Sequence, residues 1–395
     1  MLPLTQSDSL SAAEQLIPAI RSVIGSGTHP LHEPLFTGKE KEYVTSCIEE
    51  GWVSSVGSFV DRFEKDVAAA CGAQHAVAVV NGTAALHMAL VASGLQPGEE
   101  VLIPSLTFVA TANAVMHAGG VPHFVDVEES SLGICPEALD AYLKSVVVQK
   151  EGAAVNRKTQ ARIRALLPVH VFGHPCQVQR LLRVAQYYGL AFIEDATEAL
   201  GSTYQDKKVG SEHTAIISFN GNKILTTGGG GAVVTNNAGL AQRIKHLTTQ
   251  AKEPHKWDFS HDAVGWNYRL PNLNAALGCA QLEQLDGFVA AKRKLADRYM
   301  QAFAGIEGVH FLKEPANTRS NYWLNTLVTD RSESGWMNET LAALHEDGLL
   351  CRPVWRPLHQ LPMYAGMPRS DLRFTENLAQ RIISLPSSVK LAKEM

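Results

Sequence analysis

Residues 218–231 read Ser-Phe-Asn-Gly-Asn-Lys-Ile-Leu-Thr-Thr-Gly-Gly-Gly-Gly. Apolar runs at 215–219 and 232–235 flank this stretch and are typical of buried strands, so we expect Lys223 to lie on a loop held by a sheet. Desolvation on such a loop lowers the pKa of an amine from its usual value of about 10.4, and a neutral amine can attack a carbonyl carbon. The glycines let backbone approach closely and leave four residues free to adopt positive φ.

Two other interpretations of Lys223 stay open at this point. A lone lysine beside a glycine-rich turn is usually a solvated surface residue. A phosphate-binding loop needs the order Gly-Lys-Ser/Thr after a strand, and here the lysine precedes the glycines, which argues against it. Features elsewhere in the chain decide between a surface lysine and a reactive one.

The composition is that of an ordinary globular protein. The chain has 395 residues, 45% of them apolar and 19% charged, with a formal net charge of −4. No block of Lys and Arg stands out, which argues against broad nucleic-acid binding and against a polybasic membrane contact. No secretory leader and no run of about 18 apolar residues occurs, and the cysteines form no Cys-x-x-Cys pair, so reduced thiols and a cytoplasmic location are expected.

Strand and helix patterns alternate from residue 75 to about 235. The expected strands are 75–80, 100–104, 121–125, 165–171 and 190–195, and the expected helices include 59–71, 84–91, 136–147 and 176–188. The polar segment 149–160 has no pattern and is expected to be an exposed insertion. This alternation predicts an α/β fold with a mostly parallel sheet.

The pattern changes after residue 283, which predicts a second, smaller unit. A helix at 282–303, a strand near 322–328, a helix at 334–347 and a last helix after Thr375 indicate an α+β domain. At the other end, a helix at 11–24 with Ser11 as a possible cap is expected as an appendage, followed by a helix at 37–50. The predicted domains are an N-terminal helical extension at 1–31, a large domain at 32–283 and a small C-terminal domain at 284–395.

Two points in the large domain have features of a ligand site. Asn81-Gly82-Thr83 joins a strand directly to a helix, and the free NH groups and positive dipole of a helix start favour an anion, although Thr83 could simply cap the helix. Asp195 ends a buried strand, where open α/β sheets place ligands, although a plain surface aspartate is the alternative. His170 and His174 lack a third ligand with matching spacing, so no metal site is predicted.

Pyridoxal 5′-phosphate (PLP) would explain the helix start at Thr83, the acid Asp195 and Lys223 together. Its phosphate needs oriented NH groups and hydroxyls, its ring nitrogen stays protonated only beside a carboxylate, and its aldehyde needs an amine. Phe108, on a loop that leads into a helix, could cover a flat ring, although an aromatic there would by default belong to the core.

Five ordered motifs make the chain resemble the DegT/DnrJ/EryC1/StrS family of sugar-nucleotide aminotransferases from about residue 32 to the end. They are Asn-Gly-Thr-Ala-Ala-Leu at 81–86, Thr-Phe-Val-Ala-Thr-Ala-Asn at 107–113, Glu-Asp-Ala at 194–196, Ser-Phe-Asn-Gly-Asn-Lys at 218–223 and Gly-Trp-Asn-Tyr-Arg at 265–269. The resemblance implies the PLP-dependent aspartate aminotransferase-like (type I) fold, with a large domain and a smaller C-terminal α+β domain. It also implies a homodimer whose active sites are shared between subunits.

The same resemblance implies roles for individual residues. Lys223 would hold PLP covalently and move protons between cofactor and substrate, Asp195 would pair with the ring nitrogen, and Phe108 would stack on the ring. The phosphate would be held by Gly82, Thr83, Ala84 and Ser218, with Asn220 assisting. Asn267 and Arg269 would reach across the dimer to the neighbouring cofactor, unless both are buried structural groups.

Two departures from the wider family stand out. Glu198 occupies a position where many members carry Gln or His, and beside the cofactor's O3′ it would need protonation or a polar neighbour. The Asn-Gly-Asn-Lys loop with its four glycines, the N-terminal helix, Pro-Leu-His-Glu-Pro at 30–34 and the segment 248–257 together resemble the LegC-type branch of legionaminic acid synthesis.

The expected activity is amino transfer in two half-reactions, from glutamate to C4 of a UDP-linked 4-keto-6-deoxy-N-acetylhexosamine, for nonulosonate or surface-glycan synthesis. Substrate contacts are expected from Ser55, Val56, Arg352, Trp355 and His359, although the last three could only order a domain corner. A different NDP-ketosugar, such as GDP-4-keto-6-deoxymannose, could be the acceptor instead. The chain could also be a PLP sugar dehydratase, against which Lys223 argues, or a non-catalytic PLP-binding protein.

Overall fold

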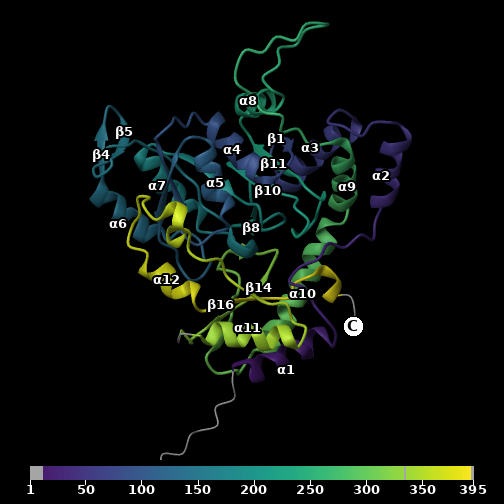
Figure 1. Ribbon diagram of the computed structural model, residues 1–395, viewed down its shortest axis with the longest axis vertical. Helices are drawn as coiled ribbons and strands as arrows, with labels where there is room; N and C mark the ends of the chain where they lie inside the picture. The colour runs from purple at the N-terminus through teal and green to yellow at the C-terminus, as the bar shows by residue number, and fades with distance from the viewer. Residues whose placement is uncertain (1–11, 333–334, 393–395) are drawn as a thin grey trace, which may run out of the picture.

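A seven-stranded sheet forms the centre of the computed structural model, which describes residues 12–332 and 335–392 (Figure 1). Its strands, in spatial order, are β1 (His75–Val79), β11 (Gly231–Thr235), β10 (Thr214–Ser218), β7 (Ala191–Asp195), β6 (Ile163–Leu166), β2 (Glu100–Pro104) and β3 (Val121–Val125). β11 runs antiparallel to both of its neighbours, and all other adjacent strands run parallel. The predicted α/β fold with a mixed, mostly parallel sheet is confirmed.

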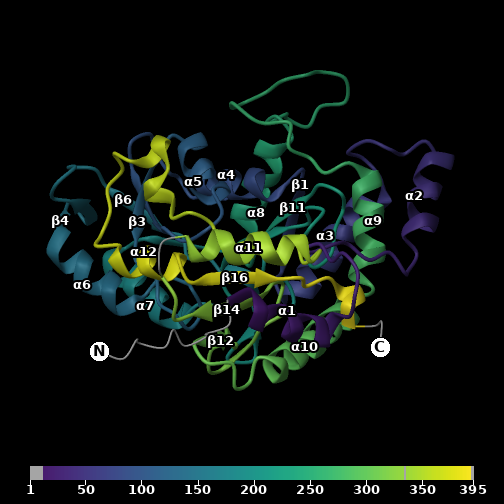
Figure 2. The ribbon, with the colours of Figure 1, turned by 60° about the horizontal axis from the view of Figure 1, so that its bottom comes forward.

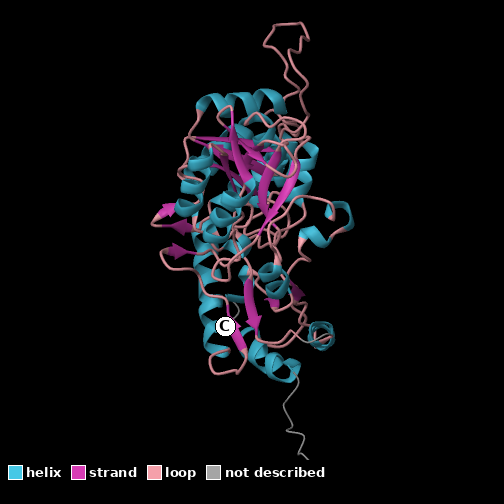
Figure 3. Ribbon diagram, turned by 90° about the vertical axis from the view of Figure 1, so that its left-hand side faces the viewer, coloured by secondary structure: helices cyan, strands magenta, loops and turns pink. Residues whose placement is uncertain are grey.

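Helices cover both faces of this sheet (Figure 3). They are α3 (Ser58–Cys71), α4 (Gly82–Ala92), α5 (Ala110–His117), α6 (Pro136–Val146), α7 (Val178–Tyr188), α8 (Ala238–Thr248) and α9 (Asn272–Leu282), while α2 (Glu40–Glu49) packs on the outside of α9. Because side chains alternate along a strand, β10 serves two cores: Ile216 packs in the cluster that contains α4, whereas Ala215 and Ile217 pack in the cluster that contains α3. The sheet is therefore buried on both faces.

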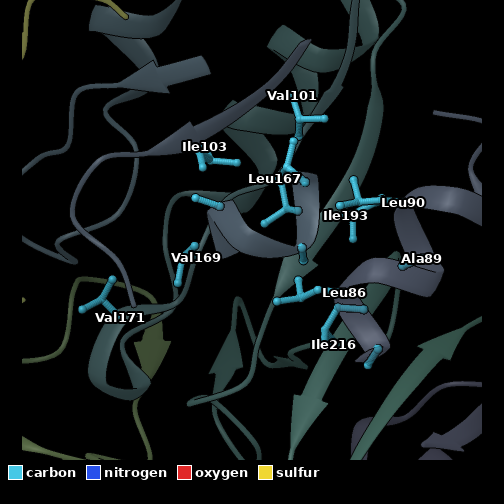
Figure 4. Packing of buried hydrophobic residues seen from close by; sticks show 14 of the residues in the cluster. Leu86, Ala89, Leu90, Val101, Ile103, Leu167, Val169, Val171, Ile193 and Ile216 are labelled. Atoms are coloured by element: carbon cyan, nitrogen blue, oxygen red, sulfur yellow. The ribbon is translucent and has the colours of Figure 1, made fainter. Parts of the chain in front are cut away.

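The packing of α4 fixes the position of its first turn. Figure 4 shows Leu86 and Leu90 of this helix beside Ile193 and Ile216 of the central strands, and all four side chains are buried. Since α4 begins directly after β1, this contact holds the helix start at the edge of the sheet where β1, β7 and β10 end. Residues from three distant parts of the sequence meet at that edge.

A second sheet, with four antiparallel strands, lies beyond α10 (Leu285–Ala302). The remaining elements of this region are β12 (Val309–Phe311), β14 (Asn325–Thr329), α11 (Trp336–Glu346), β15 (Arg352–Pro353), α12 (Arg373–Ala379) and β16 (Ile382–Leu385), with short 3-10 helices at Leu358–Gln360, Pro362–Tyr364 and Val389–Ala392. The strand order is β12–β14–β16–β15. The predicted α+β character of this region agrees with the structure, while the exact domain boundaries stay a prediction.

The N-terminal helix α1 (Ala12–Ile24) is not the appendage that the sequence suggests. Its apolar face, including Leu16 and Ile20, is buried in one cluster with Leu295 and Tyr299 of α10 and with residues of α11. Figure 2 shows α1 beside α10 and α11, so this first helix of the chain is an integral part of the C-terminal core. The predicted cap Ser11 lies outside the described residues.

Other differences from the predicted elements are local. The segment 149–160, predicted to be an exposed insertion, is exposed at residues 149–152 and 157–160. Between them the chain is ordered and partly buried, because β4 (Val147–Lys150) and β5 (Ala153–Asn156) pair as a hairpin with Val155 and Asn156 buried. A small sheet of β13 (Thr318–Arg319), β8 (Thr203–Tyr204) and β9 (Lys207–Lys208) was also not expected. Every helix within the described residues is too short or too polar to serve as a membrane span.

The glycine run after Lys223 acts mainly through close packing. All four of its glycines are free to adopt positive φ, and Gly228 is the one that does so, at 78°. Gly231 is needed for another reason: a Cβ there would lie 2.5 Å from the carbonyl carbon of Asn81. The start of β11 thus presses against the turn that begins α4.

Candidate active site

A cavity of about 490 Å³ opens at the carboxyl edge of the large sheet. Most of the predicted site residues line it: Gly82, Thr83, Phe108, Asp195, Glu198, Ser218, Asn220, Lys223, Arg352 and Trp355. The second sheet closes it from the other side through Arg352 and Ser384, which are paired across β15 and β16. The cavity is therefore built from both sheets.

Lys223 lies on the loop between β10 and β11, as expected. Its backbone NH donates to the carbonyl of Asn220 at 3.0 Å, which forms a tight turn directly after the strand. Its amine lies 3.1 Å from Oε1 of Glu198 and 3.9 Å from the centre of the Trp323 ring. With a side chain only 13% exposed, Lys223 is not a solvated surface lysine.

Asp195 is buried at the end of β7, so it is not a surface aspartate. Its Oδ2 accepts a hydrogen bond from the Thr111 hydroxyl at 2.8 Å, and its Oδ1 accepts one from the Thr197 NH at 3.2 Å. Thr107 contacts the same threonine hydroxyl at 3.2 Å. These donors orient a carboxylate that has further lone pairs to offer a ligand.

The first turn of α4 is capped by Asn81 rather than by Thr83. The Asn81 side chain accepts from the NH of Ala84 at 2.8 Å, which leaves the Thr83 hydroxyl free of a capping role. Gly82 packs tightly, since a Cβ there would lie 3.1 Å from Cβ of Ser218. Gly82, Thr83 and Ser218 border the cavity, whereas Ala84 is buried behind them and its NH is already bonded.

Aromatic side chains form one wall of the cavity. Phe108 is 53% exposed and is therefore not a core residue. Its ring centre lies 6.4 Å from that of Trp355, which in turn lies 5.0 Å from that of Phe172. This wall offers an apolar surface for a flat ring.

Glu198 is almost fully buried beside Lys223. Its Oε2 accepts from the NH of Phe172 at 2.8 Å, while Oε1 faces the lysine amine. Burial raises the pKa of the Glu198 carboxyl, and the positive charge of Lys223 opposes this rise. The polar neighbours that a glutamate at this position requires are present.

Five other predicted site residues lie outside the cavity. Ser55, Val56 and Arg269 line a separate surface pocket with Lys245, and Asn267 is exposed nearby. His359 is 6% exposed, and its ring nitrogens contact Ser105 Oγ at 2.7 Å and Glu376 Oε1 at 2.8 Å. His359 therefore orders the chain around the cavity wall and does not border the cavity, which argues against its expected contact with substrate.

Several cavity residues were not predicted from the sequence, among them Trp323, Phe172, Thr111, Thr197, Asn222 and Ser384. Thr111 lies within the recognised motif at 107–113, so its spacing from Phe108 could have singled it out. Trp323 carries no such signal. Its indole NH donates to the backbone carbonyl of Asn222 at 2.7 Å, across about 100 positions of sequence.

The histidines of this region do not gather into a metal centre. Across residues 12–332 and 335–392, no cluster of three or more His, Cys, Asp or Glu side chains is arranged to hold a metal ion. His170 instead contacts Oε2 of Glu194 at 2.9 Å and accepts from the NH of Cys176.

A family model for the DegT/DnrJ/EryC1/StrS aminotransferase family matches residues 35–395. The chain belongs to this family. GDP-perosamine synthase of Escherichia coli O157:H7 is 37% identical to this DegT/DnrJ/EryC1/StrS aminotransferase over 92% of the chain and 94% of its own length. The GDP-perosamine synthase of Caulobacter vibrioides is also 37% identical, over 91% and 93%. The solved structure of S. venezuelae DesV is 30% identical, with a TM-score of 0.79 over 89% of this chain and 90% of its own.

This DegT/DnrJ/EryC1/StrS aminotransferase is a PLP-dependent enzyme that acts on nucleotide sugars. The residues of the cavity fit that cofactor. Lys223 provides a largely shielded amine, Asp195 a buried carboxylate with two donors already in place, and the start of α4 with Ser218 provides groups for a phosphate. The assignment of each residue to one part of the cofactor stays a proposal.

Proposed function

We propose that this aminotransferase moves an amino group from glutamate to the C4 ketone of a nucleotide-linked 4-keto-6-deoxy sugar. One observation carries the proposal: the largely shielded amine of Lys223 and the buried carboxylate of Asp195 border the same cavity at the carboxyl edge of the sheet. When bound, PLP would supply the electron sink that allows a proton to leave the carbon next to nitrogen. The protein supplies the orientation and the proton transfer.

Asp195 and the start of α4 would hold the two ends of the cofactor. The Thr111 and Thr197 donors fix the plane of the Asp195 carboxylate, so that a remaining lone pair can accept the N–H of a protonated ring. At the other end, Thr83 and Ser218 offer hydroxyls beside the positive end of the α4 dipole, where a phosphate is stabilised. Gly82 keeps that approach open, and Phe108 would cover the ring.

Lys223 would act as the acid–base group at the reacting carbon. Its amine is held between Glu198 and the face of Trp323 at the border of the cavity. A positioned amine can take a proton from one carbon and return it to another, and the face from which it returns the proton sets the configuration of the product. The presence of a lysine at position 223 also argues against the alternative function of a PLP sugar dehydratase.

The identity of the acceptor rests on two different observations. The motif pattern resembles the LegC-type branch and favours a UDP-linked 4-keto-6-deoxy-N-acetylhexosamine. Similarity to proteins named GDP-perosamine synthase favours a GDP-linked 4-keto-6-deoxyhexose. We regard both as candidate acceptors and expect one of them to be aminated much faster than the other.

The decisive experiment offers UDP- and GDP-linked 4-keto-6-deoxy sugars with glutamate and follows the products by mass spectrometry. Replacement of a ketone oxygen by an amino group in one acceptor, with formation of 2-oxoglutarate, supports the proposal. Loss of water from the sugar without an amino donor would support a dehydratase. Cofactor binding with no turnover of either sugar would support a non-catalytic protein.

We further propose that the enzyme is a homodimer in which the surface pocket of Ser55, Val56 and Arg269 faces the cavity of the partner. The pocket is lined by Arg269 and Lys245 and also by the acids Glu50 and Asp61, and Lys245 is paired with Glu64 at 2.6 Å. Arg269 is therefore the positive side chain that would meet an anionic substrate or cofactor group. Nε of Arg269 is buried and has no hydrogen-bond partner among the described residues. A group from a second subunit would satisfy it.

A further inference from the structure

One face of the second sheet carries a row of three polar side chains. Thr326 on β14 pairs directly with Ser384 on β16, and Ser384 pairs directly with Arg352 on β15. Side chains of directly paired residues in antiparallel strands lie on the same face of the sheet. Arg352 and Ser384 both line the cavity, so this face is turned toward it.

The alternate residues of the same strands are apolar and belong to a different core. Ile383, Leu385 and Leu327 are buried in the cluster that contains α1 and α10. Because side chains alternate along a strand, Ser384 and Thr326 point the other way, toward the large sheet. The packing against α1 and α10 therefore explains the apolar face and leaves the polar row unexplained.

The two hydroxyls of this row are buried without a hydrogen bond. Ser384 is 2% exposed and Thr326 is 0% exposed, and neither hydroxyl has a hydrogen-bond partner among the described residues. A buried hydroxyl without a partner costs free energy, so its presence calls for an explanation. Thr326 lies behind Ser384, whereas Ser384 borders the cavity and can donate to a ligand that binds there.

Arg352 adds a positive charge to this row. Among the described residues that line the cavity, the only cationic side chains are Lys223 and Arg352. Lys223 is paired with Glu198 at 3.1 Å, whereas no hydrogen bond or ion pair within the described part of the chain engages the guanidinium of Arg352. A guanidinium binds a carboxylate through two parallel N–H groups, and a neighbouring hydroxyl can donate a third hydrogen bond to the same carboxylate.

We propose that Arg352 and Ser384 bind a carboxylate of glutamate, the amino donor. The charge of one guanidinium matches that of one carboxylate, whereas the diphosphate of a nucleotide sugar carries more negative charge than Arg352 alone can neutralise. The inference rests on the proposed function, because it names the place where the donor of that reaction binds. It also adds Ser384 to the site, a residue that lies outside the five motifs that mark the family.

Binding of anions to the PLP-loaded, full-length enzyme tests the proposal. Glutarate is the probe for the donor site, because it has both carboxylates of glutamate but no amino group that could react. UDP and GDP are the probes for the diphosphate. In isothermal titration calorimetry, Arg352→Met should bind glutarate about 10- to 100-fold more weakly than wild type, while UDP and GDP affinities stay within about threefold. Arg352→Lys keeps the charge but loses the two parallel N–H groups, so its glutarate affinity should lie between those of wild type and Arg352→Met.

Arg356→Met is the matched control for the loss of a guanidinium. Arg356 is exposed on the segment that follows β15, and it does not line the cavity. This variant should bind glutarate, UDP and GDP as wild type does.

Ser384→Ala separates a binding role from a structural one. The Ser384 hydroxyl has no partner among the described residues, so its loss should leave the denaturation midpoint at or above the wild-type value, while glutarate binds about 3- to 10-fold more weakly. Ser387→Ala is the matched control, because that hydroxyl accepts from the NH of Asn325 at 2.8 Å and donates to the carbonyl of Leu385 at 2.7 Å. It should lower the midpoint and leave glutarate binding unchanged.

The inference is overturned if Arg352→Met binds glutarate as tightly as wild type, or if its loss of UDP or GDP affinity is as large as its loss of glutarate affinity. A Ser384→Ala variant with a lowered midpoint and unchanged glutarate binding would likewise show that the hydroxyl is structural. If the wild-type enzyme binds glutarate but forms no 2-oxoglutarate from glutamate with any keto sugar, the proposed function is refuted and the donor site with it.

Discussion

At the scale of single residues, hydrogen-bond donors around Asp195 fix the orientation of its carboxylate. The carboxylate ends β7 and accepts hydrogen bonds from the Thr111 hydroxyl and the Thr197 NH. An asparagine at this position would place its NH2 group against one of these two donors. If Asp195 pairs with the ring nitrogen as proposed, Asp195→Asn should lower kcat about 100- to 1,000-fold, because the charge that would keep the cofactor ring protonated is lost.

Asp126 is a matched control for that measurement. It directly follows β3 and accepts from the NH and hydroxyl of Thr375, as Asp195 accepts from its threonines, but it lies outside the cavity. Steady-state kinetics of Asp126→Asn should stay within a few-fold of wild type, once the fraction of folded protein is matched. A comparable loss in both variants would show that the effect of Asp195→Asn is structural.

Lys292 makes the stability of the protein depend on pH. It is fully buried on α10, its amine donates to the carbonyl of Ser387 at 2.5 Å, and burial lowers its pKa from 10.5 to about 7. Between pH 7 and about pH 10 the unfolded state binds more protons at this residue. The free energy of unfolding should therefore rise with pH there, by up to about 1.4 kcal/mol per pH unit from this group.

Lys292→Met should flatten that part of the profile and raise the free energy of unfolding at pH 7 and below, where the buried charge is costly. Lys294→Met, on an exposed position of the same helix, should leave the slope unchanged. Denaturant titrations at a series of pH values measure both. If the free energy of unfolding of Lys292→Met rises with pH as steeply as that of wild type, other groups cause the pH dependence.

Sequence reasoning found the residues whose position follows from one segment alone. Lys223 and Asp195 directly follow or end apolar runs, so the edge of the sheet could be inferred for both. Trp323 lies just before β14 and reaches the same cavity because this segment folds against the loop at Asn222, about 100 positions earlier. Ser55, Val56 and Arg269 were placed in the site by resemblance, and a single subunit does not bring them there.

At the scale of elements, the contact between β11 and the start of α4 leaves no space for a side chain. A Cβ at Gly231 would lie 2.5–2.7 Å from the backbone of Asn81 and Gly82. Gly231→Ala should lower the free energy of unfolding by about 1–3 kcal/mol, and it should also weaken PLP binding by displacing the first turn of α4. Fluorescence titration with PLP and denaturant unfolding measure the two effects.

Gly287 is a glycine without a packing role and serves as the control for Gly231. It is exposed on α10, its φ is not positive, and a Cβ there would have no neighbour within 4 Å. Gly287→Ala should raise the free energy of unfolding by about 0.5–1 kcal/mol through helix propensity. A stabilising Gly231→Ala would contradict the packing described here.

Among the elements that sequence reasoning missed, α9 and the β4–β5 hairpin have weak periodicity. α9 is buried on most of its surface, with Ala275, Ala276 and Cys279 inside, so no polar face marks it as a helix. β4 and β5 carry polar outward residues such as Gln149 and Lys150, which hid the hairpin. In both cases the element is determined by its packing in the folded protein, which the local pattern of apolar and polar residues does not show.

At the scale of the whole molecule, the predicted site is divided between two cavities. If Arg269 serves the active site of the partner, Lys223→Ala and Arg269→Ala should each be inactive alone but complement each other. After unfolding and refolding as an equal mixture, half of the dimers would contain one intact site, which gives up to about a quarter of wild-type activity. Arg243→Ala, from the neighbouring surface of α8, replaces Arg269→Ala in the control mixture and should remain active alone.

No recovery in the mixture of Lys223→Ala and Arg269→Ala would show that each subunit uses its own Arg269. Size-exclusion chromatography with light scattering gives the oligomeric state in parallel. A monomeric but active enzyme would contradict the shared site directly.

The burial of α1 against α10 and α11 has a consequence during translation. Leu16 and Ile20 are synthesised about 280 positions before Leu295 and Tyr299, against which they pack. At about 5–20 residues per second, this apolar stripe would wait on the order of tens of seconds for its partners. The nascent chain therefore offers a hydrophobic segment that chaperones can bind until the last third of the polypeptide emerges.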